Sequence, residues 1–238
     1  MIRSILTTLV CLLAFLLNAT GQSQTRSQVY GDNLTKQAQT FYVRADTGMT
    51  TFDSEAAGSK ETRSTQDFEV GGWLGETRLA GIKVQSREDD VPFELNQSQL
   101  ANKFTDVRMM ARLWWFIPSV GVSLSEVDVS RADVKTVGLF GTGLNAGLGV
   151  NVNLYPGILF SGDFMKVKSN HVYDKLSQSD NLGDRDEIDG HIAFDLTERV
   201  VDLIVGYRVR KYEIETAAEA YSEQAQGAYA GIRLGLYF

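Results

Sequence analysis

The chain has 238 residues, with 23 Lys and Arg against 30 Asp and Glu, a formal net charge of −7, and 43% hydrophobic residues. This composition is ordinary for a folded protein and excludes the fibrous and disordered classes. The acidic balance argues against a nucleic-acid-binding protein, which needs a basic face. After the N-terminus, no uncharged apolar run is long enough for a membrane-spanning helix.

Residues 1–21 have the pattern of a cleaved secretory signal peptide. Arg3 precedes an apolar run from Ile5 to Leu17, and Ala19 and Gly21 are small residues suited to a cleavage site. An uncleaved signal anchor is the alternative interpretation. The pattern therefore predicts export from the cytoplasm.

The mature chain is expected to begin after this signal. The sole Cys, Cys11, lies inside the apolar run and is lost on cleavage, so no disulfide is expected. Residues 22–39 are polar and predict a loose periplasmic lead-in. The remaining residues, 40–238, are expected to form one domain.

Turn signals recur about every 40 residues along this domain and predict five hairpins, hence ten strands. The signals are Gly75–Arg78, Ile117–Ser119, Tyr155–Gly157 and Leu196–Arg199. Longer loops are expected at the opposite end, over roughly 53–64, 88–103, 130–136, 168–186 and 213–225. Short turns at one end and long loops at the other are typical of transmembrane barrels.

Within each unit, apolar and polar residues alternate with a period of two. The odd positions from Val201 to Val209 are apolar, whereas Asp202, Arg208 and Arg210 occupy the other face. A soluble β-sandwich or a lipocalin-like barrel would also alternate, so alternation alone does not show which face meets lipid. The signal peptide and the difference between turns and loops favour the membrane.

The predicted fold is therefore all-β, a transmembrane antiparallel up-and-down β-barrel of ten strands. Eight strands are the alternative, reached by merging two of the ten. The weakest strand is Val120–Val129, where the apolar parity slips between Leu124 and Val127. We interpret that slip as a β-bulge.

The last residues, AYAGIRLGLYF, resemble the C-terminal strand of Gram-negative outer-membrane β-barrel proteins. The resemblance implies an outer-membrane location and contact with outer-membrane lipid and lipopolysaccharide. It also implies recognition by the barrel-assembly machinery, through Ile232, Leu234, Leu236 and Phe238. It leaves any extracellular partner open.

Aromatic residues concentrate near the predicted short turns, and the outward members predict a girdle at the lipid interface. They are Phe41, Tyr42, Trp73, Trp114, Trp115, Phe116, Tyr155, Phe160, Tyr237 and Phe238.

The inward face carries basic and acidic residues in balance, which predicts ion pairs that fill the lumen. The predicted network comprises Arg44, Asp46, Asp67, Glu69, Lys83, Asp106, Arg108, Arg112, Asp189, His191, Asp195, Asp202, Arg208, Arg210 and Arg233, and Arg87 and Asp163 share this face. In the sixth strand, Gly141, Gly143, Gly147 and Gly149 predict room either for long Arg side chains or for water. Acidic residues within 180–187 and 213–223 are assigned to solvated loops.

The sequence favours a structural or surface-interaction role, with no enzymatic activity, metal or cofactor. A narrow, porin-like solute channel is the alternative. Asp189-Gly190-His191 together with Asp89 and Asp90 resembles the rim residues of omptin outer-membrane proteases. That resemblance implies that Asp189 and His191 form the base pair and that Asp89 and Asp90 hold the water. Membership of His191 in the lumen network is the favoured interpretation.

Overall fold

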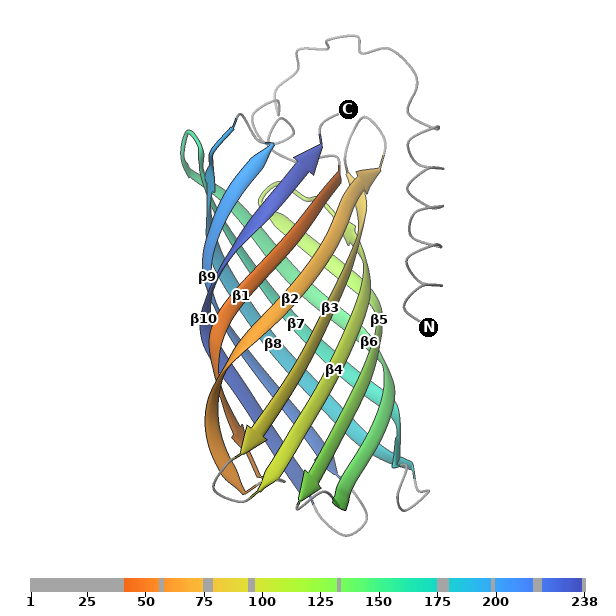
Figure 1. The fold of residues 1–238 in the computed structure, drawn as a ribbon. Helices are drawn as coiled ribbons and strands as arrows, with labels where there is room; N and C mark the ends of the chain where they lie inside the picture. Colours follow the sequence, from red (N-terminus) through yellow and green to blue (C-terminus); the bar gives the residue numbers. More distant parts are fainter. Residues whose placement is uncertain are drawn as a thin grey trace.

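The computed structural model is a closed barrel of antiparallel strands (Figure 1). The structure describes residues 41–55, 58–74, 79–93, 97–131, 134–174, 180–197, 200–215 and 220–236, with their side chains except at 131–137, 169–182, 214–221 and 236. The predicted signal peptide, the lead-in and Phe238 lie outside these ranges. Among the described residues, no helix is long and apolar enough to cross a membrane.

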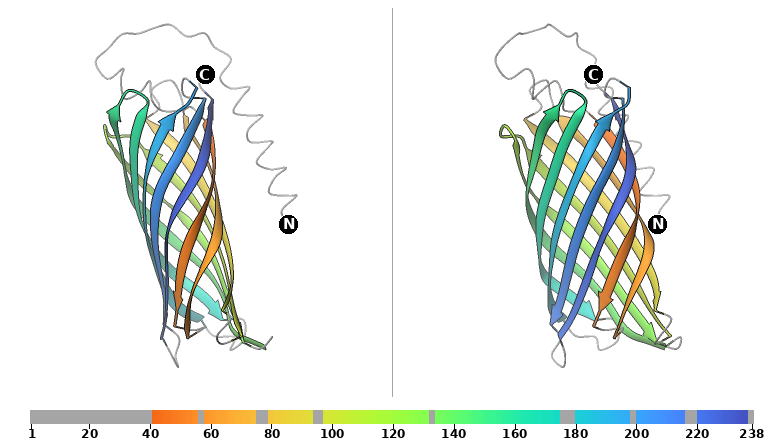
Figure 2. Two further views of the ribbon diagram at one scale, coloured as in Figure 1. Left: turned by 60° about the vertical axis from the view of Figure 1, so that its left-hand side comes forward. Right: turned by 90° about the vertical axis from the view of Figure 1, so that its left-hand side faces the viewer.

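The strands follow one another around the barrel in chain order, and their steep slant is visible in Figure 2. They are β1 (Phe41–Ser54), β2 (Ser59–Leu74), β3 (Ala80–Phe93), β4 (Ser98–Ala111), β5 (Phe116–Arg131), β6 (Val134–Tyr155), β7 (Ile158–Asp174), β8 (Asp180–Asp195), β9 (Val201–Glu215) and β10 (Ala220–Leu236). Antiparallel pairing of β1 with β10 closes the sheet. The predicted ten-stranded up-and-down barrel is confirmed, and the eight-stranded alternative is wrong.

Consecutive strands are separated by at most five residues at both ends of the barrel. The expectation of long loops at one end is therefore wrong. For example, β3 continues to Phe93 and β4 begins at Ser98, with both strands paired through the range assigned to a loop. In this range the outward residues are polar and the inward residues are apolar, which is the reverse of the rest of each strand. The polar outward residues alone therefore resemble those of a solvated loop.

The turn predicted at Ile117–Ser119 lies instead at 112–115. Leu113 and Phe116 form an isolated bridge around this turn, and Trp114 has φ 62°. Pro118 belongs to β5 and lies beyond Met110–Ser119, the last pair of the β4–β5 ladder. Because β4 offers no partner at that position, the missing N–H of Pro118 breaks no hydrogen bond with β4.

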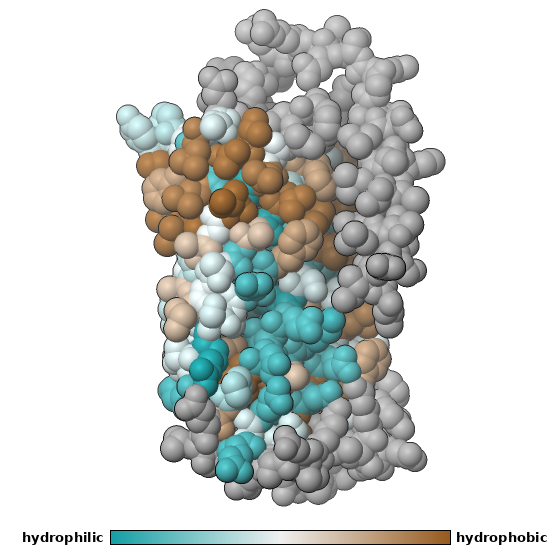
Figure 3. Space-filling view, viewed as in Figure 1, coloured by the Kyte–Doolittle hydropathy of each residue, from teal (hydrophilic) through white to brown (hydrophobic). Residues whose placement is uncertain are grey.

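We call the end of the barrel at which β1 begins and β10 ends the terminus end. The outer surface toward this end is apolar, and we call this zone the lipid belt (brown in Figure 3). Its members include Phe68, Met109, Phe116, Val120, Val122, Leu148, Phe160, Phe164, Ile188, Ile192, Leu203, Val205, Tyr207, Ile232 and Leu234, all exposed. On β9 the belt runs from Val201 to Val209, about 20 Å along the barrel axis at 3.3 Å per residue and a tilt of about 40°. This height is close to the ~25 Å apolar band of outer-membrane barrels.

Exposed aromatic residues lie at the terminus end of the belt. Trp114, Trp115, Phe116 and Tyr155 are all exposed there. Indole and phenol rings suit a membrane interface because one end is apolar and the other is polar. Trp73, from the same predicted set, instead points inward and is buried.

Beyond the belt, the outward residues become polar and form a zone that we call the collar (teal in Figure 3). On β7 the change falls between Phe164 and Lys166, and on β9 between Val209 and Lys211. A cross-strand ion pair joins Lys166 to Asp186 at 3.3 Å. Similar pairs join collar residues of β1 to β2 and of β3 to β4. The strands β1–β4 and β7–β9 thus extend past the lipid belt into a polar zone.

Inside the collar, the lumen is filled by a cluster of buried apolar side chains that we call the plug. Its members are Phe52, Val91, Phe93, Leu100, Phe104, Val127, Val129, Leu139, Tyr212 and Ala225. The collar is therefore apolar inside and polar outside, as in a soluble barrel, whereas the belt has the reverse arrangement.

The plug also explains the parity slip in β5. Leu124 faces outward in the belt, whereas Val127 and Val129 face inward in the plug. Pairing with β6 is regular from Phe116 to Val129, and the register shift comes only after Val129. The bulge predicted between Leu124 and Val127 is wrong. The apolar residues move from the outer to the inner face of the sheet there, whereas the backbone pairing stays regular.

Candidate functional site

The predicted lumen residues lie on inward positions within the barrel wall. Most are buried, and the side chains of Lys83, Arg208 and Arg233 remain 11–16% exposed. Of the predicted assembly strand, Ile232 and Leu234 face outward from β10. The side chain of Leu236 and the whole of Phe238 lie outside the part of the chain that the structure describes.

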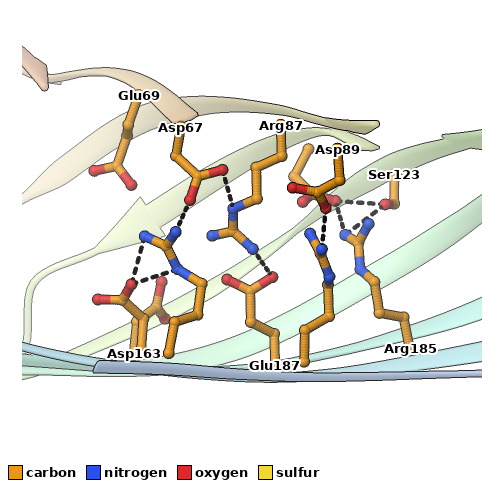
Figure 4. Close-up of polar contacts among 12 residues, drawn as sticks. Asp67, Glu69, Arg87, Asp89, Ser123, Asp163, Arg185 and Glu187 are labelled. Carbon is orange, nitrogen blue, oxygen red and sulfur yellow. Dashed lines mark hydrogen bonds and ion pairs between the residues drawn. The ribbon is translucent and has the colours of Figure 1, made fainter. Parts of the chain in front are cut away.

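Several ion pairs cross the lumen between strands on opposite sides of the barrel (Figure 4). Arg108 on β4 binds Asp163 on β7 with two hydrogen bonds, of 2.6 and 3.1 Å. Lys83 on β3 reaches the same carboxylate at 2.7 Å. Bidentate pairing of this kind fixes geometry as well as charge, so these contacts tie the walls together.

A second set of cross-lumen pairs lies closer to the plug. Arg87 on β3 binds Glu187 on β8, whose strand is on the far side of the ring. The other pairs are Arg185 with Asp106, Arg210 with Asp89, and Arg208 with Asp67. Together with the Arg108 and Lys83 contacts, these pairs make a charged layer between the plug and the terminus end.

Asp189 is the most connected carboxylate in this layer. It accepts hydrogen bonds from the Tyr229 hydroxyl at 2.8 Å and from Arg208 Nε at 2.8 Å. In addition, the Arg44 guanidinium lies 3.6 Å from Oδ2 of Asp189, and His191 Nδ1 lies 3.1 Å from Oδ1. The guanidinium groups of Arg44 and Arg208 also lie over the Tyr229 ring, so one tyrosine and one carboxylate connect the four strands β1, β8, β9 and β10.

These contacts do not support the arrangement implied by the omptin resemblance. Asp89 points inward to Arg210, whereas Asp90 points outward and accepts a hydrogen bond from Gln99 at 2.7 Å. The two carboxylates occupy opposite faces of β3 and cannot hold one water between them. Asp189 and His191 are buried in the lumen rather than exposed at a rim.

The sequence-based prediction misses four charged lumen residues among those that the structure describes. Arg185, Glu187, Glu223 and Asp89 all fall within predicted loops, and the omptin resemblance implies a rim position for Asp89, yet all four are buried inside the barrel. A signal was present, because Arg185 and Glu187 continue the alternation that includes Asp189 and His191. Extending the strand by two pairs would have placed them correctly.

A cavity of about 100 Å³ lies in the lumen on the terminus side of the plug. Its lining includes Trp73, Ile117 and Leu159, which lie within two residues of strand ends at the terminus side, and no member of the plug. Gly147 and Gly149 of β6 make room beside it. A Cβ atom at Gly147 would lie 3.1 Å from an Arg108 nitrogen and 2.8 Å from Ser119 Oγ. Gly147 therefore accommodates a long Arg side chain, one of the two predicted uses.

Among the described residues, no three His, Cys, Asp or Glu side chains are grouped as a metal ion would require. Asp and Glu in the lumen are instead engaged by Arg and Lys. The chemistry that this site offers is charge pairing and hydrogen bonding across a closed lumen.

Comparison with protein-family models found no match, and comparison with curated proteins found none either. Solved structures with a similar fold do exist. The outer-membrane protease OmpT from Escherichia coli superposes with a TM-score of 0.52 at 8% identity, covering 90% of this chain and 100% of that one.

Two further solved structures also match. Neisserial surface protein A matches with a TM-score of 0.38 at 12% identity, covering 82% of this chain and 97% of that one. Ail, the attachment invasion locus protein of Yersinia pestis, matches with a TM-score of 0.40 at 7% identity, covering 83% and 100%. With its closed ten-stranded antiparallel sheet, this chain has a β-barrel fold like that of the outer-membrane protease OmpT.

Proposed function

We propose that this chain is a sealed outer-membrane barrel with a structural or surface-interaction role, and that it does not conduct solutes. The plug is the observation that carries the proposal. Leu100, Phe104 and Val127 are at most 2% exposed and fill the lumen inside the collar. An ion that crossed this zone would give up hydration for contact with these apolar side chains, which costs several kcal/mol or more.

The charged layer adds a second barrier. Its guanidinium and carboxylate groups are paired across the lumen, as with Arg108 and Asp163 or Arg87 and Glu187. A passing ion would have to break such pairs, and removing one partner of a buried pair costs about 3–5 kcal/mol. The layer thus supports the wall instead of lining a path.

The collar supplies the surface for interaction. Because its outward residues are polar and of mixed charge, it is suited to contact with water and with charged groups beyond the hydrocarbon. Lys166 and Lys211 lie directly beyond apolar belt residues, where the phosphates of outer-leaflet lipopolysaccharide would lie if the collar faces outward. We therefore assign the collar to the cell exterior and the chain termini to the periplasm.

The outward residues of β10, the strand that closes the barrel, support the proposal that the barrel-assembly machinery is a partner during biogenesis. Ile232 and Leu234 face outward on β10, consistent with recognition of this strand by the barrel-assembly machinery. Deletion of Phe238 is expected to reduce insertion in cells more than refolding into detergent. Equal effects in both settings would argue against recognition of the terminus.

Conductance of the refolded protein in planar bilayers tests the sealed lumen. The proposal predicts no stable current steps from the wild-type protein at neutral pH. The channel alternative predicts steps that scale with salt concentration, and their observation would overturn the proposal. A refolded porin measured in the same bilayers serves as the positive control.

A further inference from the structure

The lumen cavity combines paired charges with unpaired neutral groups. Lys83 and Arg108 share Asp163, and Arg233 binds Asp202 at 2.7 Å. In contrast, Ser119 Oγ, His191 Nε2 and Gln85 Oε1 are buried and have no hydrogen-bond partner among the described residues. All three side chains belong to the cavity lining.

Buried polar atoms of this kind are costly unless another group satisfies them. An unsatisfied buried donor or acceptor costs about 1–3 kcal/mol, and polar cavities of sufficient size hold water in such positions. A volume of about 100 Å³ exceeds what one water requires. Three unpaired groups on β3, β5 and β8 therefore define a hydrogen-bonding chamber between facing walls.

The charges of the lining limit what the chamber can accept. An anion would compete with Asp163 for Lys83 and Arg108, and a cation would compete with the same guanidinium and ammonium groups for the carboxylates. A neutral guest breaks none of these pairs and can meet the free hydroxyl, imidazole and amide groups. Ser119, His191 and Gln85 thus supply neutral hydrogen-bonding capacity, and Arg108 Nε in the same lining also has no hydrogen-bond partner among the described residues.

Access is also one-sided. The plug closes the chamber toward the collar, whereas the lining reaches Trp73, the penultimate residue of β2, and Ile117, the second residue of β5. We propose that this cavity is a hydrated binding chamber for small neutral hydrogen-bonding solutes, of the amide or polyol class, entered from the terminus end. This proposal goes beyond the sealed-barrel function, because the lumen of a sealed barrel could equally be dry.

Trp73 is a built-in reporter for this proposal. It lines the cavity, and its ring lies 4.2 Å below the Arg112 guanidinium. The variant with Trp114→Phe and Trp115→Phe keeps Trp73 as the only Trp and changes only residues that are exposed at the membrane interface. Its fluorescence would be titrated in detergent with acrylamide, a neutral amide, and separately with iodide and caesium.

A matched reporter in the plug supplies the comparison. Phe104→Trp, in a background with all native Trp replaced by Phe, places the indole in the apolar plug, and Phe93→Trp is the substitute if that protein does not fold. Acrylamide is expected to quench Trp73 about fivefold more strongly than the plug reporter, because only the chamber is hydrated. Iodide and caesium should quench Trp73 no more than they quench the plug reporter.

Two results would overturn the proposal. Acrylamide quenching of Trp73 at the level of the plug reporter would mean that the cavity is dry or closed to solutes. Iodide or caesium quenching as strong as that of acrylamide would mean that the chamber accepts ions. Filling the cavity with Ser119→Leu should reduce acrylamide quenching, and Ser119→Ala, which keeps the space, should largely retain it. Equal quenching in these two variants would place the solute elsewhere.

Discussion

Truncation of Phe104 tests whether the plug is a packed core. The ring is 2% exposed, meets the Tyr212 ring edge-on at 5.6 Å, and lies under the guanidinium groups of Arg185 and Arg210 at 4.5 and 4.7 Å. Phe→Ala in a packed core costs about 3–5 kcal/mol, to which an aromatic pair contributes about 0.5–1.5 kcal/mol. We expect Phe104→Ala to lower the free energy of unfolding by that amount.

The assay is reversible denaturant unfolding in phospholipid vesicles, followed by Trp fluorescence. Thr105→Ala is the matched control, because Thr105 is the next residue on β4 and faces outward. Its effect should stay within about 0.5 kcal/mol. A loss below about 1 kcal/mol for Phe104→Ala, comparable to the control, would show that the collar lumen is loosely filled and refute the reasoning.

Glycine substitutions on neighbouring strands should differ sharply. A Cβ atom at Gly206 would clash with the Tyr229 ring and lie 2.7 Å from the Gly190 carbonyl oxygen, whereas one at Gly190 would meet nothing within 4 Å. Gly206→Ala should therefore cost about 1–3 kcal/mol by overpacking and Gly190→Ala almost nothing, judged by the temperature at which gel mobility changes to that of the unfolded chain; equal stabilities would contradict the packing. Orientation can be tested with single cysteines, because the mature chain is expected to lack Cys. Gln224→Cys in the collar should react with an impermeant maleimide on intact cells and Thr197→Cys at the other end should not, and the reverse pattern would invert the barrel.

The strand count was predictable because turn spacing and alternation follow from backbone geometry. A strand with one apolar face must alternate, and the odd positions from Val201 to Val209 do face outward in the structure. Tyr155–Gly157 also contains the true turn of the β6–β7 hairpin, where Gly157 has φ 80°. These features depend only on local sequence.

The collar was not predictable in the same way, because its polarity is inverted. Lys103 and Glu126 on the outer face look like loop residues when an apolar outer face is expected. The apolar partners that identify these segments as strands, such as Leu100 and Val127, point inward. Recognising the inversion requires knowing which residues lie beyond the membrane, and only the closed sheet shows that.

The pairing of the lumen charges also depended on the closed sheet. Alternation placed Arg108 and Asp163 on the inward face, but they are 55 residues apart and lie on strands that are not neighbours. Which carboxylate each Arg meets depends on strand slant and register around the whole barrel. The sequence therefore predicts a charged lumen, but it does not predict which carboxylate each Arg binds.

Depth-dependent quenching tests the division into lipid belt and collar most directly. Single Trp residues at Leu203, Ile204 and Lys211, all on β9, would be compared in a background without native Trp, using brominated lipid. Strong quenching at 203, and little at 204 or 211, is the predicted result, because only Leu203 faces the hydrocarbon. Strong quenching at 211 would extend the membrane over the collar, and quenching at 204 greater than at 203 would reverse the faces of the barrel; either result would contradict the account.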